Sequence, residues 1–534
     1  DETRSALSNF PFFHSKTFPM RPFETLLFFA NLTTFTLIAV PRLHTPSRMF
    51  VVALITALIA GIQIRIEGRR WQMIPAYALT IIFCLIWLLG FVLPGGNPVK
   101  AWIVGLGIGL GVLALAVSAA VSIVLPVFHF PKPTGPYAIG TLTYHWVDTS
   151  RPELFTPDPN DHRQLMAQVW YPAKEEPSAR RAPYIEDAEL VTAAIGRLLH
   201  LPEFVFSHLK YVTTNAVASA PVADDQSSYP VLIYLTGVDG FRSASTFQIQ
   251  ELVSHGYIVV GLDQPGIAPL VRFPDGRQIT GWPRDKIQPL IMQSVESQPE
   301  APALYGKALP DGIIPYFAQD VSLGLDQLAQ LNKSDPNHIL TGRLDLEQAG
   351  TFGISLGGMN AAQACLTDPR LKACLIMDVW MPASVVESGL RQPAMFITRD
   401  ADTMRLEWSE KDIALTLDTM RAVYESLPDA GYYVEIPKMF HNNFTDLPLW
   451  SPLFPLLGLT GPINAQRGFD IVNAYSVAFF NEQLGGQPSS LPNGPSQQYP
   501  EVIFSSKRTG TDPETTHAMT LISQSRTHRT GPHR

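Results

Sequence analysis

The stretch Gly353-Ile354-Ser355-Leu356-Gly357-Gly358 decides the fold of this chain. Glycine, serine and glycine at alternate positions form the pattern of a nucleophile elbow, in which a serine stands on a sharp turn between a strand and a helix. The residues before it, 349–352, predict a strand, and 356–366 predict a helix. Glycine on either side removes Cβ atoms that would clash in so tight a turn. We therefore expect Ser355 to be exposed, with backbone N–H groups at the helix start directed at a developing oxyanion.

The sequence around this motif alternates between short β-branched runs and helical stretches. Such alternation predicts a mostly parallel sheet covered by helices on both faces, which together with the elbow indicates an α/β-hydrolase fold over residues 130–487. The expected strands are 137–147, 165–173, 229–236, 257–263, 349–355, 372–378, 393–400 and 432–437. The expected helices include 244–255, 316–331 and 356–366.

A serine nucleophile needs a base that takes its proton and an acid that orients the base. In this fold the chain order is serine, acid, histidine. Four histidines follow Ser355, and three of them, His517, His528 and His533, fall in a polar C-terminal segment. The remaining one is His441, which directly follows the last expected strand. We therefore predict His441 as the base.

The acid has two candidate positions. The usual position in the fold favours Asp400 or Asp402, after the expected strand 393–400. The alternative is Asp378, which ends the expected strand directly after the elbow helix and so lies at the carboxyl edge of the sheet. The residues alone leave this choice open.

The first 129 residues contain hydrophobic runs at 24–40, 49–64, 74–93 and 101–125. A membrane-spanning helix needs about 20 mostly apolar residues. The last two runs meet this requirement, the first is borderline and the second is short. We expect an all-α transmembrane region of about four helices over 1–129, with no paired buried charges and no polar stripe, which serves as an anchor. Residues 488–534, rich in Ser, Pro, Thr, Gln and Arg, are expected to be a disordered tail.

Positive charges near the membrane indicate the orientation of the chain. With four spans, the side of the catalytic region carries Arg4, Lys16, Arg21, Arg65, Arg69 and Arg70, and the other side carries Arg42, Arg48 and Lys100. The positive-inside rule then predicts that the catalytic region faces the cytoplasm, most simply from a bacterial inner membrane.

Composition excludes several other classes of protein. The net charge of −8 is spread without long charged blocks, so we expect no nucleic-acid partner. Cys84, Cys365 and Cys374 form an odd, sparse set that predicts buried free thiols rather than disulfides or a metal site. We expect no metal and no cofactor, and the oligomeric state is not predicted.

The catalytic region resembles the platelet-activating factor acetylhydrolase family, in particular its plasma-type and bacterial members. The similar stretches are Phe130–Gly140, Trp146–Asp148, Val169–Pro172, Tyr229–Tyr234, Gly237, Phe241-Arg242, Asp378–Met381 and His441–Phe444. The resemblance covers most of 130–450 in order. It implies Asp378 as the acid, with Asp402 in reserve, and the N–H groups of Val238 and Leu356 as the oxyanion hole. Thr236 and Ile354 depart from the family, which often has histidine at both positions.

The resemblance also implies a substrate class. Members of the family cleave short or oxidised acyl chains from phospholipids and small esters without calcium, so we expect a membrane-associated serine esterase that acts on such substrates. Two alternatives stay open: an acyltransferase that uses the same triad, and a non-catalytic membrane binding protein with a hydrolase fold. The segment 176–222 is apolar enough to line an acyl pocket or touch lipid, and an ordinary packed insertion is as good an interpretation.

Overall fold

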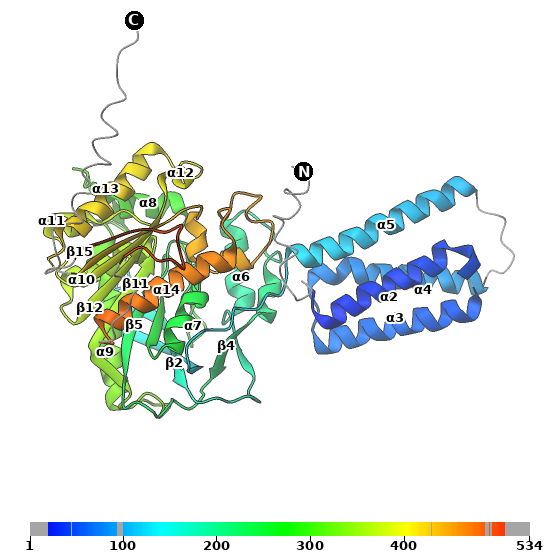
Figure 1. Ribbon diagram of the computed structural model, residues 1–534, viewed down its shortest axis with the longest axis horizontal. Helices are drawn as coiled ribbons and strands as arrows, with labels where there is room; N and C mark the ends of the chain where they lie inside the picture. Colours follow the sequence, from blue (N-terminus) through cyan, green and yellow to red (C-terminus); the bar gives the residue numbers. More distant parts are fainter. Residues whose placement is uncertain are drawn as a thin grey trace, which may run out of the picture.

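The computed structural model describes residues 20–43, 45–92, 100–428, 430–485, 491 and 494–507. These residues form a bundle of long helices and a larger α/β region, joined end to end (Figure 1). The chain runs through the bundle first and then builds the sheet.

The bundle consists of α2 (Pro22–Ala39), α3 (Pro46–Ile66), α4 (Ile74–Val92) and α5 (Ala101–Val124). All four predicted hydrophobic runs are therefore helical. Within the described residues, these four helices are long and apolar enough to cross a membrane. Their outer faces expose leucine, isoleucine and valine side chains, as a lipid-facing surface requires.

The interior of the bundle contains a buried ion pair and buried polar side chains beside its apolar clusters, contrary to our expectation of no paired buried charges. Glu24 and Arg70 form an ion pair of 2.6 Å whose side chains are 0% and 1% exposed. Farther along, the Oγ1 atoms of Thr34 and Thr56 lie 3.0 Å apart. The sequence did not reveal the ion pair because its members are 46 residues apart. They meet because α2 begins at the end of the bundle where the loop before α4 also lies.

The α/β region is built on an 11-stranded sheet. From one edge to the other its strands are β15 (Ile503–Lys507), β14 (Gly431–Ile436), β13 (Ala394–Arg399), β12 (Leu371–Met377), β11 (Leu344–Ile354), β5 (Tyr229–Leu235), β6 (Ile258–Asp263), β2 (His162–Ala173), β1 (Ala138–Pro152), β4 (Thr213–Ala218) and β3 (Arg181–Pro183). The six strands from β14 to β6 are parallel to one another, and the strands on either side of this group, β15 and β2, pair with it antiparallel. The eight predicted strands are all present, and the α/β-hydrolase fold is confirmed. Two small hairpins, β7 (Leu270–Arg272) with β8 (Gln278–Thr280) and β9 (Ala303–Leu304) with β10 (Lys307–Ala308), lie outside the sheet.

Helices cover both faces of this sheet, as Figure 1 shows. On β5, Val231 and Ile233 pack into one hydrophobic core and Leu232 and Tyr234 into the other, as the two-residue period of a strand requires. The first core is completed by α9 (Ile314–Lys333), α10 (Leu356–Thr367), α11 (Ala383–Ser388) and α13 (Glu410–Ser426). The second is completed by α7 (Thr246–Ser254) and α14 (Ala465–Gln483). The remaining helices are α6 (Ala188–Leu198), α8 (Arg284–Gln293) and the short α12 (Ala401–Met404).

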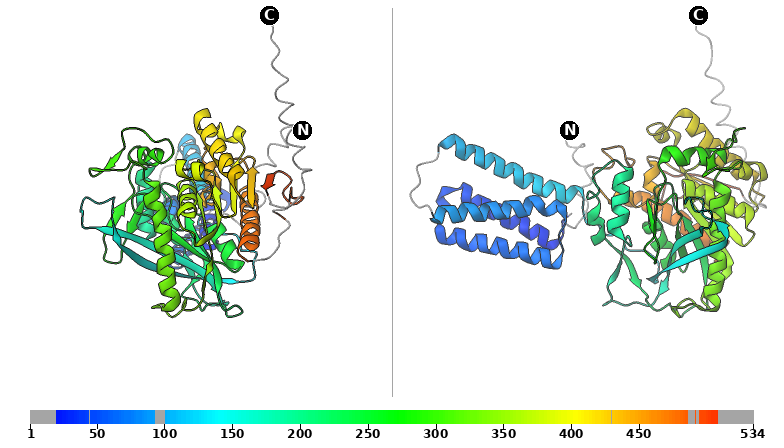
Figure 2. Two further views of the ribbon diagram at one scale, coloured as in Figure 1. Left: turned by 90° about the vertical axis from the view of Figure 1, so that its left-hand side faces the viewer. Right: turned by 180° about the vertical axis from the view of Figure 1, so that it is seen from behind.

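The insertion 176–222 joins the α/β region to the bundle. Trp71, in the short 3-10 turn Trp71–Met73 before α4, packs edge to face on Phe204 with ring centres 5.2 Å apart, and its Nε1 donates a hydrogen bond to the Val205 carbonyl at 3.2 Å. The hydroxyl of Tyr211 donates to the Arg69 carbonyl at 2.6 Å. The right view in Figure 2 shows the bundle against this side of the α/β region. The insertion therefore fixes the two parts against each other.

Part of the C-terminal segment 488–534 is ordered, which corrects our expectation of a disordered tail. Ile503–Lys507 forms β15, which pairs antiparallel with β14 at the edge of the sheet. The pairing satisfies the otherwise open edge of β14, a gain that composition does not reveal. The rest of this expectation, including His517, His528 and His533, lies mostly outside the described residues.

Two of the three cysteines are joined, contrary to the prediction of free thiols. Cys365, in the last turn of α10, forms a disulfide with Cys374 in β12, while Cys84 is free. The connection from α10 to β12 is short, so the chain returns beside the helix and brings the two cysteines together. The disulfide ties the elbow helix to the strand that precedes Asp378.

Candidate active site

Ser355 stands between β11 and α10 in a backbone conformation that side chains rarely adopt. Its φ is 57° and its ψ is −131°. A Cβ on Gly353 would lie 2.4 Å from the Gly357 carbonyl, and one on Gly357 would lie 2.1 Å from the Leu235 carbonyl oxygen. Any side chain at either glycine would therefore push the turn apart. The local structure is that of the predicted elbow, and Ser355 is half-buried at its tip.

The loop after β5 lies directly beside the serine. A Cβ on Gly237 would lie 2.9 Å from Ser355 Cβ and 3.4 Å from its Oγ. Among the described residues, the backbone N–H groups of Val238 and Leu356 have no hydrogen-bond acceptor. Two unpaired N–H groups on the segments that flank a nucleophile are what an oxyanion hole needs.

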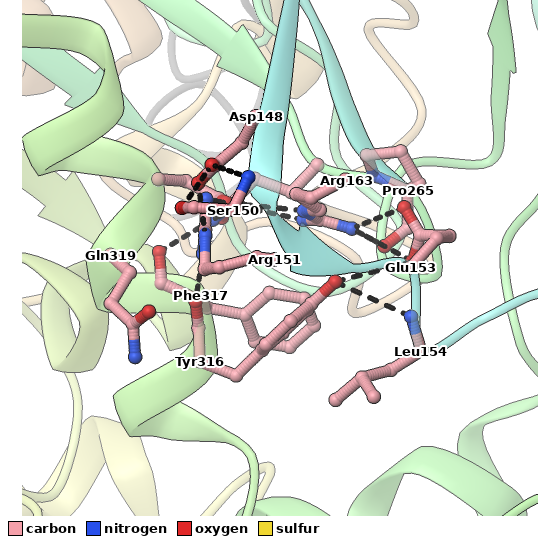
Figure 3. Close-up of polar contacts among 12 residues, drawn as sticks. Asp148, Ser150, Arg151, Glu153, Leu154, Arg163, Pro265, Tyr316, Phe317 and Gln319 are labelled. Carbon is pink, nitrogen blue, oxygen red and sulfur yellow. Dashed lines mark hydrogen bonds and ion pairs between the residues drawn. The ribbon is translucent and has the colours of Figure 1, made fainter. Parts of the chain in front are cut away.

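A buried cluster of charges supports this loop from behind. Figure 3 shows Arg163 on β2, whose guanidinium donates to the Pro265 carbonyl at 3.2 Å. The same guanidinium forms a fully buried ion pair of 2.6 Å with Asp320 on α9. Ile267 lies two residues after Pro265, and its carbonyl accepts the N–H of Asp239, in the loop after β5, at 3.2 Å. The cluster therefore fixes the segment against which the oxyanion loop rests.

His441 and Asp378 meet at the carboxyl edge of the sheet. His441 Nδ1 lies 2.7 Å from Asp378 Oδ2, and Asp378 is fully buried while the His441 side chain is 22% exposed. Because the ionised carboxylate can only accept, Nδ1 carries the proton and Nε2 is left to take one. Burial alone would raise the pKa of Asp378, but the charge of Arg399 and the hydrogen bond from His441 outweigh it and hold that pKa below its usual range. Asp378 is therefore ionised at neutral pH.

The other candidate acids have different roles. Asp400 caps the N-terminus of α12, where its side chain accepts the Thr403 N–H at 2.8 Å, and it also accepts the Lys438 N–H. Asp402 is 93% exposed and pairs with Arg405. Among the described residues neither carboxylate is bonded to His441. The structure thus brings His441 together with Asp378, as the resemblance implied.

Ser355 Oγ makes no hydrogen bond within the described part of the chain. Catalytic hydrogen bonds of this kind are often long before a substrate binds. The described residues contain no group of three His, Cys, Asp or Glu side chains that could hold a metal ion.

Sequence reasoning missed the residues that surround Asp378. Arg399, the last residue of β13, donates from Nε to Asp378 Oδ2 at 2.9 Å, and Thr398 donates its hydroxyl to Oδ1 at 3.0 Å. Arg399 also contacts Glu407 and Trp408, which lie beside His441. The order of the parallel strands did indicate that Arg399 and Asp378 are close, since β12 and β13 are neighbours and their carboxyl ends meet at one edge of the sheet.

Comparison with known proteins agrees with this geometry. The family model "Platelet-activating factor acetylhydrolase, isoform II" matches residues 123–264 and 317–492, which is more than half of the chain. The chain belongs to this family. A probable 1-alkyl-2-acetylglycerophosphocholine esterase of Arthroderma benhamiae is 24% identical over 72% of this chain and 96% of its own length. The platelet-activating factor acetylhydrolase of Cavia porcellus is 23% identical over 66% of this chain and 78% of its own.

Among solved structures, a ferulic acid esterase from Streptomyces cinnamoneus matches with a TM-score of 0.54, at 24% identity, over 71% of this chain and 99% of its own. That similarity supports the fold. Membership of the acetylhydrolase family makes the chain a carboxylic ester hydrolase. Ile354 and Thr236, the two residues that depart from the family pattern, both pack inside the fold. Ile354 is buried in the core, and the Thr236 hydroxyl fills the space beside Gly240.

Proposed function

We propose that this acetylhydrolase family member cleaves esters with a Ser355–His441–Asp378 triad. Ser355 Oγ attacks the ester carbonyl while His441 Nε2 takes its proton, and His441 then gives that proton to the leaving alcohol. The Asp378 carboxylate holds Nδ1–H and stabilises the imidazolium. The N–H groups of Val238 and Leu356 bind the oxyanion, and water releases the acyl group by the reverse steps.

The single observation that carries this proposal is the 2.7 Å hydrogen bond between His441 and the buried Asp378. It joins residues 63 positions apart at the sheet edge that also presents the strained Ser355. An ion-paired carboxylate behind an imidazole whose other nitrogen is free is the arrangement that a serine nucleophile requires.

As substrates we propose short acyl esters, including phospholipids with a short or oxidised acyl chain. Two relatives support this class, since one is named as a probable 1-alkyl-2-acetylglycerophosphocholine esterase and the other as a platelet-activating factor acetylhydrolase. The loop that follows His441 supports a lipid substrate independently, because Leu456 and Leu457 are 73% and 65% exposed there. The Leu459 carbonyl of the same loop accepts a hydrogen bond from Asn442 at 3.0 Å, so an apolar surface adjoins the catalytic histidine.

The side of the membrane has two opposed indications. The excess of arginine near the catalytic region favours the cytoplasm. The Cys365–Cys374 disulfide favours an oxidising compartment, because cytosolic thiols are kept reduced. We propose the oxidising side, since a covalent bond is a more specific indication than a margin of a few charges. Residence in a bacterial inner membrane stays a prediction. In spheroplasts, whose outer membrane no longer excludes proteins, a protease that cannot cross the inner membrane should then cut the catalytic region, and full protection would contradict this assignment.

The test is hydrolysis of p-nitrophenyl acetate, butyrate and octanoate by the full chain in detergent. We expect activity without added metal, falling with chain length. Ser355→Ala should lower kcat by about 10⁴-fold or more. The control is Ser388→Ala, which removes an exposed serine at the end of α11 and should leave the rate unchanged.

An inactive wild type, or an unchanged rate in Ser355→Ala, would refute the proposal. Adding competing alcohols to the assay separates hydrolysis from acyl transfer, because a transferase would release an ester of the added alcohol.

A further inference from the structure

A buried arginine shares the carboxylate oxygen that holds the catalytic histidine. Arg399 Nε and His441 Nδ1 both donate to Asp378 Oδ2, at 2.9 and 2.7 Å. Arg399 and Asp378 are each 0% exposed, so water screens neither charge. Part of the negative charge that would stabilise an imidazolium is therefore directed at a guanidinium instead.

Glu407 closes this arrangement into a ring. Arg399 Nη1 donates to Glu407 Oε2, and the same oxygen accepts the backbone N–H of His441 at 3.1 Å. The contacts thus run from the His441 ring through Asp378, Arg399 and Glu407 back to the His441 main chain. The histidine is held at both its side chain and its backbone by one chain of charge-assisted hydrogen bonds.

Trp408 completes the surroundings of the guanidinium. The central carbon of Arg399 lies 4.2 Å from the centre of the Trp408 ring, and the Trp408 and His441 rings are 5.1 Å apart. Arg399 Nη2 has no hydrogen-bond partner among the described residues, so the indole face is the favourable neighbour of this part of the cation. A planar guanidinium fits between two carboxylates and an aromatic ring in a way that a lysine does not.

We propose that Arg399 and Glu407 are positioning residues for His441, which fix the imidazole and set how strongly its charged form is stabilised. We refer to the two residues as the histidine clamp. The inference rests on the proposed function, because it concerns the base of the same triad. Neither clamp residue touches the reacting atoms, so each acts through Asp378 or the His441 main chain.

The sign of each contribution follows from its charge. Arg399 opposes the imidazolium and also offsets Asp378, while Glu407 favours the imidazolium and offsets Arg399. The other groups that face Asp378 are neutral: Thr398 donates its hydroxyl, and burial raises the pKa of Tyr433 on β14, so its phenol stays protonated. The two clamp residues should therefore act on the base in opposite directions.

The test measures the acid limb of the kcat/KM profile of the full chain in detergent. In Arg399→Met this limb should move to higher pH, by about one unit, since a neighbouring charge shifts a titration by about that much or more. In Glu407→Gln, which keeps an oxygen for the His441 N–H, it should move to lower pH, by about half a unit. Arg399→Lys retains the charge but not the fork, so it should restore the wild-type limb while kcat stays several-fold low.

The control is Arg405→Gln, which removes an arginine paired with Asp402 and Glu410 on the same segment and should shift nothing. Opposite shifts support the clamp, and a merely structural role would give lower activity with an unmoved limb or the same shift in both variants. If Arg399→Met does not fold, Glu407→Gln decides alone: a downward shift supports the clamp and no shift overturns it.

A fluorophosphonate probe for Ser355 separates the two proposals. A wild type that is neither labelled nor active overturns the proposed function, and a labelled, active wild type with unshifted variants overturns only the clamp.

Discussion

Two buried arginine–carboxylate pairs, Arg70–Glu24 in the helical bundle and Arg399–Asp378 in the α/β region, have different surroundings. In the bundle, Arg70 binds Glu24 and directs its other donors to main-chain carbonyls at the end of α5, including that of Leu125 at 2.7 Å. At the sheet edge, Arg399 binds Asp378 and directs its other donor to Glu407. The remaining hydrogen bonds of the first pair go to main-chain carbonyls, so this pair holds helices together. In the second pair, both Asp378 and the Arg399 partner Glu407 accept hydrogen bonds from His441. Burial of an ion pair therefore says little about its role, whereas the remaining hydrogen bonds of the arginine say much.

The largest expected effect separates the two carboxylates. Asp378→Asn should lower kcat by about 10⁴-fold, because an amide at this position no longer enforces the tautomer that His441 needs. Glu24→Gln should leave kcat/KM unchanged and lower thermal stability, since breaking one side of a buried ion pair costs about 3–5 kcal/mol. Kinetics on a p-nitrophenyl ester and thermal unfolding in detergent give both values.

The exposed Asp402 supplies the matched control, and Asp402→Asn should change neither quantity. A loss of activity in Glu24→Gln at full folding would break the comparison, because the bundle would then act on the site.

A smaller effect is expected at the junction between the two regions. Burial, together with the positive charge of Arg70, lowers the pKa of His208 to about 4. The unfolded chain takes up this proton near its ordinary value of about 6.5, so the folded state loses stability as the pH falls from about 6.5 towards 4. His208→Gln should remove up to about 3 kcal/mol of this pH dependence. Thermal unfolding at pH 7 and pH 4.5 measures it, and an equal pH dependence in both proteins would contradict the burial of a neutral imidazole.

The smallest expected effect concerns the covalent link in the α/β region. The paired substitution of Cys365 and Cys374 by alanine should cost about 2 kcal/mol, because the disulfide closes a short loop. Activity at 25 °C should stay near the wild-type value, as neither cysteine contacts Ser355 or His441. Cys84→Ala is the control in the bundle, and mass shifts after thiol alkylation report whether the bond is present.

The sequence predicted the parts of this molecule that depend on local pattern. Short stretches of sequence are enough to predict the four apolar helices, the eight main strands and the turn at Ser355. Chain order then predicted His441. The choice of Asp378 over Asp400 needed the family resemblance, because both residues end strands at the same sheet edge.

The features that the sequence did not predict are contacts between distant segments. Arg399 is one example, since nothing in the sequence around it indicates that its side chain turns towards Asp378. The contact between Glu24 and Arg70 is likewise not indicated by the residues around either of them. Nor does the sequence of β15 indicate that it pairs with the edge of β14. Such contacts depend on how the elements are arranged in three dimensions, which residue spacing does not encode.

The contact between Trp71 and the segment Phe204-Val205 has a kinetic consequence. It fixes the α/β region on four helices that are long and apolar enough to span a bilayer, so an enzyme inserted through these helices would hold its catalytic region at the membrane surface between turnovers and would meet lipids by lateral diffusion. The rate of such an enzyme depends on the fraction of the membrane lipids that are substrate, and not on the amount of substrate per volume of water. Diluting a lipid ester with inert lipid should slow such an enzyme even when the total amount of the ester is unchanged.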